Sequence, residues 1–199
     1  MTVRGVNEDI QSQIERLEEI IHKNDSIQKV LNVAHAEFDH YYIGAGSIVQ
    51  TVWNDLSGNP LNYGINDIDI IYYDEDLSGE KEKKIEQRLQ HLLCDLPLEI
   101  DVKNEARVHL WYEEKFGRKI EQYQSLEDAI NSWPTTATAL GVRKDDEGTF
   151  KVYAPYGLND LFTMTVRANK VMITRDVYEA KVVKWTSKWD LNVIPWKDS

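Results

Sequence analysis

The sequence predicts an α/β (α+β) fold: a small mixed sheet with flanking helices and additional helices at the N- and C-terminal ends. Three observations favour this fold class. Segments with helical spacing of apolar residues alternate with short β-rich runs along the chain. Apolar residues make up 42% of the 199 residues, which is enough for a packed core. Six Trp and ten Tyr argue against disorder, because disordered segments typically contain few aromatic residues.

The N-terminal part of the chain predicts the sheet and its first helices. Residues 57–64 are rich in turn formers and predict a loop. Residues 104–116 fit a helix capped by Asn104, although the alternation of Val108, Leu110 and Tyr112 also fits a strand. The other expected elements are helices over 7–23, 24–38, 48–56 and 80–93, and strands over 41–43, 67–73 and 98–103.

The C-terminal part predicts a hairpin and more helices. A short helix begins near Ser125 and ends at Pro134, because proline disfavours helix at the residue before it. Residues 137–154 predict a β-hairpin around Asp145–Gly148, and helices are expected near 158–167 and 175–189. We expect one domain over 1–199, with a soft subdivision into a catalytic-type core, 1–117, and a hairpin and helical extension, 118–199.

Charge and composition narrow the partners and the location. The formal net charge is −11, whereas a protein that grips a long nucleic acid usually carries an excess of Lys and Arg, so such a partner is not expected. No 18-residue apolar run predicts a membrane helix, and residues 1–9 lack the apolar core of a signal peptide. The single cysteine, Cys94, cannot form an internal disulfide. These features favour the cytoplasm and leave the oligomeric state open.

Three aspartates on apolar strands suggest a metal site. In Asp67-Ile68-Asp69 the two carboxylates point to the same face of the strand, because side chains alternate along it. Asp101 lies between Ile100 and Val102 on another expected strand. Aspartate is a poor strand former, so its presence in apolar strands indicates a functional role. Adjacent carboxylates repel one another unless a cation lies between them, and Mg²⁺ prefers such oxygen ligands.

Other residues near this pattern could bind phosphate. Gly46 and Ser47 lie in a turn at an expected helix start, where exposed N–H groups can bind a triphosphate. A serine in this place could equally be only an N-cap. Arg107 is the best nearby cation, since arginine binds phosphate through a bidentate fork, but a salt bridge to Glu105 or to an aspartate explains it at least as well.

This arrangement resembles the DNA polymerase β-like nucleotidyltransferase superfamily. The matching residues are Ala45-Gly46-Ser47, Asp67-Ile68-Asp69 and Asp101. From about Tyr42 to Trp196 the chain resembles more closely a largely uncharacterised family of bacterial proteins labelled nucleotidyltransferases. Further segments that carry this resemblance are 44–54, 106–112, 133–139 and 156–162. The interval of nineteen residues between Ser47 and Asp67 is longer than is usual in the superfamily, and the extra length falls in the 57–64 loop.

The resemblance implies a nucleotidyltransferase fold and a function. The expected activity is transfer of a nucleoside monophosphate from an NTP such as ATP to a hydroxyl group of a small molecule or protein, with Mg²⁺ or Mn²⁺ as the cofactor. Asp67, Asp69 and Asp101 would bind metal, and Asp101 would also help to deprotonate the acceptor. The alternative is a protein of the same fold that binds a nucleotide in regulation without transferring it.

Overall fold

The computed structural model describes residues 5–199; residues 1–4 of the expected single domain lie outside the described residues. Its centre is a five-stranded mixed sheet with the strand order β3-β2-β1-β4-β5. Strands β2 and β3 are parallel and the other neighbours are antiparallel. The strands span β1 Tyr41–Gly44, β2 Asp67–Tyr72, β3 Glu99–Asn104, β4 Gly141–Lys144 and β5 Phe150–Tyr153. A mixed sheet with flanking helices confirms the predicted fold class.

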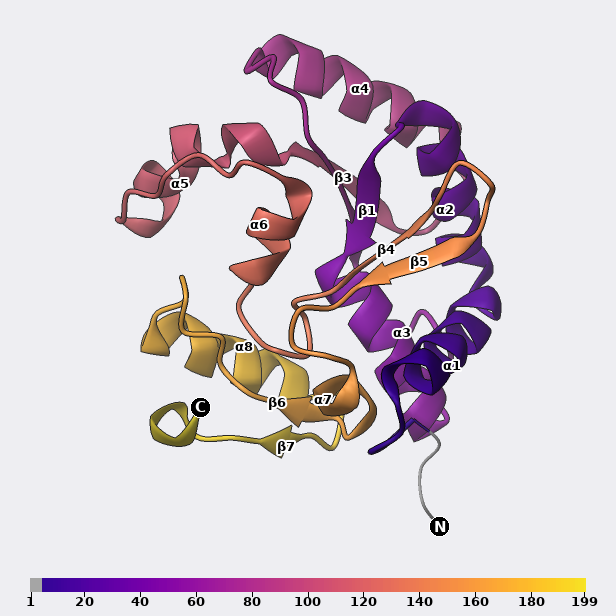
Figure 1. Cartoon of the computed structure of the whole chain (residues 1–199), viewed down its shortest axis with the longest axis vertical. Coiled ribbons are helices and arrows are strands. Elements are labelled where there is room, and N and C mark those ends of the chain that lie inside the picture. Colours follow the sequence, from indigo (N-terminus) through magenta and orange to yellow (C-terminus); the bar gives the residue numbers. More distant parts are fainter. Residues whose placement is uncertain (1–4) are drawn as a thin grey trace.

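Helices cover both faces of this sheet. Figure 1 shows α1, α2 and α3 on one side and α5, α6 and α8 on the other, with α4 at one end. A separate pair of short strands, β6 and β7, lies beside α8 near the C-terminus. The bounds are α1 Ile10–His22, α2 Asp25–Glu37, α3 Ala45–Ser57, α4 Gly79–Leu92, α5 Val108–Phe116, α6 Leu126–Asn131, α7 Asn159–Phe162, α8 Arg175–Thr186, β6 Thr165–Val166 and β7 Asn192–Val193, with 3-10 turns at Glu105–Arg107 and Trp196–Asp198.

The alternation of side chains along β2 separates two hydrophobic clusters. Ile68 and Ile70 are fully buried in the main core, together with residues of α1, α2 and α3. Ile71 points to the other face, where it packs with Tyr42 of β1 and Leu126 of α6 in a smaller cluster. Since Asp69 alternates with Ile68 and Ile70, its carboxylate lies on the face of Ile71, away from the main core.

Several predicted elements have different bounds in the structure. Residues 104–116 form a 3-10 turn and α5, so the helical alternative was correct. The hairpin begins at Gly141 rather than Thr138, because Thr135 and Thr138 close a turn through hydroxyls 2.8 Å apart. The helix expected at 158–167 stops at Phe162, since Met164 takes a left-handed conformation with φ +51° and β6 follows.

The 57–64 loop is anchored to the rest of the fold. Asn54 donates hydrogen bonds of 2.9 Å to the carbonyls of Leu61 and Tyr63, and it accepts one of 2.8 Å from the indole of Trp189. Lys188 donates to the carbonyl of Gly64 at 2.8 Å. The extra length before β2 therefore joins α3 to the segment that follows α8.

Over the described part of the chain, none of the helices is long and apolar enough to cross a membrane.

Candidate active site

The register of β2 and β3 brings two of the predicted aspartates together. Asp69 and Asp101 are direct partners across the parallel pair, so both carboxylates lie on the same face of the sheet. Asp67 is opposite Glu99 at the beginning of β2 and is exposed. Asp69 and Asp101 are partly buried. The three predicted residues thus lie on adjacent strands, with Asp69 the deepest of them.

The electrostatics of Asp69 reflect this crowding. Burial, followed by the nearby carboxylates of Asp67 and Asp101, raises the pKa of Asp69 to about 7. The positive charges of Lys103 and Lys181 act in the opposite direction but do not cancel the effect. The ionised form of Asp69 is therefore destabilised in the free protein, and a bound cation would stabilise it.

Lys103 lies beside the carboxylates of the site. Lys103, two residues after Asp101 on the same face of β3, donates a hydrogen bond to the Asp101 carboxylate. Within residues 5–199, no three His, Cys, Asp or Glu side chains lie close enough to hold one metal ion in this conformation. The donor chemistry fits Mg²⁺, because carboxylates are hard oxygen ligands and the raised pKa of Asp69 shows that its anion lacks enough positive charge nearby.

The glycine turn joins β1 to α3 beside Asp69. Gly44 is the β1 partner of Asp69 and the N-cap of α3, and no side chain caps this helix. A Cβ on Gly44 would lie 2.2 Å from the ring of Trp133, so only glycine fits against this indole. Ala45 follows with φ +47°, which is unusual for a residue with a side chain. An uncapped helix N-terminus favours a bound anion.

Gly46 and Ser47 lie in the first turn of α3. The Ser47 side chain is buried, and its hydroxyl donates to the carbonyl of Gly44 at 3.4 Å. In this conformation the hydroxyl therefore supports the turn. A Cβ on Gly46 would meet the amide end of the Gln50 side chain at 3.0 Å, so a larger residue here would require this flexible side chain to shift. The predicted phosphate contacts of both residues stay predictions.

A cavity of about 640 Å³ opens over the two central carboxylates. Asp69, Asp101 and Lys103 line it from the sheet. Lys181 of α8 lines it from the opposite side, and burial, helped by Lys184, lowers the pKa of Lys181. The aromatic part of the lining is Trp111, Tyr112, Phe116, Tyr123 and Trp133. The cavity thus combines acidic, cationic and aromatic walls, which suits a ligand with a planar ring and an anionic group.

Arg107 does not line this cavity. Its guanidinium forms an ion pair with Glu82 of α4 and donates to the carbonyl of Leu77 at 3.0 Å. The structure therefore places Arg107 in a link between α4 and the turn after β3. Arg107 thus forms a salt bridge, as the alternative expected, but its partner is Glu82 and not Glu105 or an aspartate. The phosphate role of Arg107 stays a prediction.

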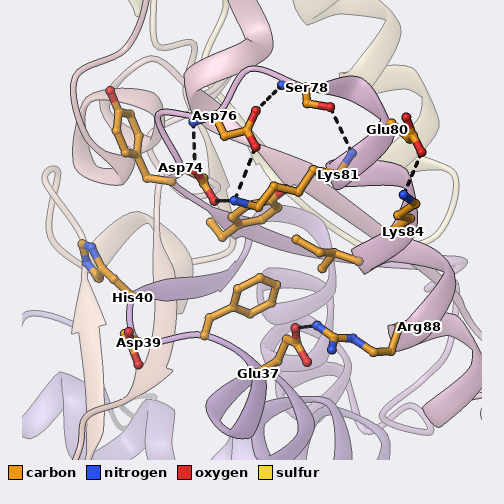
Figure 2. A pocket seen from close by; sticks show the side chains of 14 residues that line it. Glu37, Asp39, His40, Asp74, Asp76, Ser78, Glu80, Lys81, Lys84 and Arg88 are labelled. Atoms are coloured by element: carbon orange, nitrogen blue, oxygen red, sulfur yellow. Dashed lines mark hydrogen bonds and ion pairs between the residues drawn. The ribbon is translucent and has the colours of Figure 1, made fainter.

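A second cavity, of about 860 Å³, lies beyond the other end of β2 and is drawn in Figure 2. Its lysines and its arginine each form an ion pair with an acidic side chain of the same cavity. Lys81 binds Asp74, Lys84 binds Glu80 at 2.7 Å, and Arg88 binds Glu37. Because these three cations are already paired with acids and none of the three predicted aspartates lines this cavity, we place the candidate active site in the smaller cavity.

Sequence reasoning missed three residues of the cavity wall. Lys181 carried a signal, since a lysine on the apolar face of the expected C-terminal helix is unusual. Trp133 lies in the segment 133–139 that carries the family resemblance, but as one of several tryptophans it was expected to lie mostly in the core. The sequence suggested Glu105 only as a possible salt-bridge partner of Arg107. In the structure Glu105 is buried and lines the cavity.

Comparisons with known proteins identify the fold and the family of the chain. A search of curated proteins found no match. A solved structure described as an NMR structure that reveals a CCA-adding enzyme head domain is similar in fold, with a TM-score of 0.74 and 24% sequence identity over 98% of this chain and 100% of that one. Residues 32–193 match the family described as Nucleotidyltransferase. With the greater part of its length matched, the chain belongs to this nucleotidyltransferase family.

Proposed function

We propose that this protein transfers a nucleoside monophosphate from an NTP to a hydroxyl group of a small molecule or protein, and that the reaction depends on Mg²⁺ or Mn²⁺. The observation that carries the proposal is the pairing of Asp69 with Asp101 across β2 and β3, next to the uncapped start of α3 and facing a cavity with cationic walls. Family membership supports nucleotidyl transfer in general.

In the proposed reaction an acceptor oxygen attacks the α-phosphorus of the NTP in line with the leaving group. A new P–O bond forms to the acceptor, the bond to the β-phosphate breaks, and pyrophosphate leaves. The acceptor hydroxyl loses its proton, and Asp101 would accept it. Lys181 and the N–H groups at the start of α3 offset the charge of the phosphates.

Asp67, Asp69 and Asp101 are the residues that would hold the metal. Bound there, Mg²⁺ supplies positive charge that offsets the charge developing on the phosphate oxygens. Binding would also compensate the crowding that raises the pKa of Asp69 to about 7. Because Lys103 now hydrogen-bonds Asp101, its ammonium must move away from that carboxylate if Asp101 is to become a ligand.

The net charge of the protein limits which classes of acceptor are suitable, whereas the site itself does not identify the acceptor. The net charge of −11 disfavours a long nucleic acid, so a small hydroxyl compound or a protein side chain fits better. The proposal keeps the cytoplasmic location and the single domain over 1–199 that the sequence leads us to expect.

The test is release of pyrophosphate and transfer of label from α-labelled NTPs in the presence of Mg²⁺, with pools of small hydroxyl compounds and of proteins as acceptors. Asp69→Asn and Asp101→Asn are expected to abolish transfer. Glu99→Gln is the matched control, because Glu99 is an exposed acid on the same strand as Asp101. Transfer by both Asn variants at the wild-type rate would refute the assignment.

One observation favours a second function, binding of a nucleotide without transfer. The ion pair between Lys103 and Asp101 satisfies a carboxylate that catalysis needs as a ligand or base. If this pair persists when nucleotide is bound, the cavity can hold an NTP but cannot activate an acceptor. Calorimetry that shows nucleotide binding, together with no pyrophosphate release in a single-turnover assay, would favour this function.

A further inference from the structure

Glu105 is a buried residue whose carboxyl oxygens have no hydrogen-bonding partner among residues 5–199. It follows β3 directly, in the 3-10 turn Glu105–Arg107, and only 6% of its surface is exposed. Among residues 5–199 no group donates a hydrogen bond to its carboxyl oxygens and no lysine or arginine forms an ion pair with them. Its side chain nevertheless lines the 640 Å³ cavity of the candidate active site. Buried carboxyl groups are normally hydrogen-bonded or ion-paired, so this exception needs an explanation.

The surroundings of Glu105 make this position costly for the free protein. Burial, followed by the charges of Asp69 and Glu82, raises the pKa of Glu105 to about 8. The opposite charge of Lys103 reduces the effect, but that ammonium is hydrogen-bonded to Asp101. A residue that costs stability in the free state and faces a cavity is typical of a contact reserved for a ligand.

Glu105 lies between the two chemically different parts of the cavity. Its charge acts on Asp69, at the carboxylate end, and also on the phenol of Tyr123, which hydrogen-bonds Ser132 at 2.6 Å. Both Tyr123 and Ser132 line the cavity, as does the aromatic pair Trp111 and Tyr112 of α5. A nucleotide with its phosphates toward Asp69 would place its base along this aromatic side, where planar rings stack favourably.

We propose that Glu105 hydrogen-bonds the polar edge of the nucleobase and so sets which base the cavity accepts. The inference rests on the proposed function, since it takes an NTP as the occupant. Every base presents N–H donors or acceptor atoms at the edge that pairs in duplexes, and a carboxyl group is suited to such an edge. A buried carboxyl that finds a partner there would favour that base, and a base that leaves it unpaired would be disfavoured.

The test compares three proteins: wild type, Glu105→Gln and Glu105→Met. Binding of each of the four NTPs, and of inorganic tripolyphosphate as a probe without a base, is measured by calorimetry. For the wild type we expect the four NTPs to differ in Kd by at least about tenfold, which is the size of effect that one good polar contact to a base edge gives. Glu105→Met is expected to compress this range to about threefold, and Glu105→Gln to keep most of it, because the amide also offers a donor and an acceptor.

Tripolyphosphate separates base recognition from charge effects. Its Kd is expected to change less than about threefold in Glu105→Met, because the lysines that would hold the phosphates are unchanged. Thermal unfolding without ligand checks the fold, and Glu105→Met is expected to be at least as stable as the wild type, since it removes a buried unpartnered carboxyl.

Three results would overturn the inference: an unchanged base preference in Glu105→Met, an equal loss in Glu105→Gln, or a loss of binding that accompanies a loss of thermal stability. These results are distinct from failure of the proposed function. If the wild type binds no NTP, the occupant is wrong. If it binds and transfers nucleotide but Glu105→Met keeps the preference, only the role of Glu105 is wrong.

Discussion

Replacing Asp69 with asparagine should stabilise the metal-free protein at alkaline pH while abolishing transfer. An aspartate in the unfolded chain ionises near pH 3.8, whereas Asp69 in the fold has a pKa of about 7. Between these two values the folded protein keeps a proton that the unfolded chain has lost, so its stability falls as the pH rises. The full cost is present above pH 7, and it is absent only below about pH 3, where the aspartate of the unfolded chain is protonated as well.

The size of the effect follows from the same two values. The difference between 3.8 and about 7 corresponds to about 4 kcal/mol of unfolding free energy. Part of this belongs to the interaction with Asp67 and Asp101, so about 4 kcal/mol is the upper limit for the gain in Asp69→Asn at pH 8.5. At pH 4.5 the gain should fall to about 1 kcal/mol, because the folded carboxyl is then protonated and the pH is less than one unit above the pKa of 3.8 in the unfolded chain.

Urea unfolding of wild type and Asp69→Asn in EDTA, followed by tryptophan fluorescence at pH 4.5 and 8.5, measures this difference. Addition of Mg²⁺ at pH 8.5 should stabilise the wild type more than the variant, because the cation binds only the folded site. Equal stability of the two proteins at both pH values would refute the reasoning, as would equal stabilisation by Mg²⁺.

Four further predictions concern other parts of the site. Lys181→Met should raise the KM for NTP at least about tenfold, because it removes a positive charge that would face the phosphates. Lys83→Met, on the exposed side of α4, should leave the KM unchanged, and steady-state kinetics of both variants measures the difference. Gly44→Ala should lower the unfolding free energy by about 1–3 kcal/mol, because its Cβ would overlap Trp133; denaturant unfolding measures the loss, and wild-type stability would contradict the close contact. Arg107→Met should cost at least about 1 kcal/mol of stability through its partly buried partner Glu82; if the remaining folded protein keeps its KM for NTP, the phosphate role of Arg107 is wrong. Lys103→Met should leave Asp101 without its ammonium partner and tighten Mg²⁺ binding at pH 7; weaker binding in calorimetry would show that Lys103 supports the site.

The alternation of aspartate and isoleucine in residues 67–70 was enough to predict both the strand and the face of the carboxylates. Its signal is strong because a period of two is hard to mistake when polar and apolar residues alternate strictly. The isolated aspartate at 101 carried the same signal on β3. What the pattern could not give was the parallel register that makes Asp69 and Asp101 neighbours, because register depends on the helix that connects the strands.

The rest of the site depends on contacts between distant segments. Lys181 reaches the carboxylates from a helix eighty residues later in the chain than Asp101, and only the packing of α8 over the sheet brings it there. The sequence suggested Glu105 only as a salt-bridge partner of Arg107, because burial of a charged residue in a short turn has no sequence signal. Strands β6 and β7 have two residues each, which is too short for any periodicity.

A structure with Mg²⁺ and a non-hydrolysable NTP bound tests the central claim most directly. The account predicts metal between Asp69 and Asp101, phosphates near Lys181 and the start of α3, and the base beside Glu105 on the aromatic wall. Lys103 should then have left the Asp101 carboxylate. A triphosphate bound instead by Lys81 and Arg88 in the cavity of Figure 2, with no metal at the two aspartates, would contradict it.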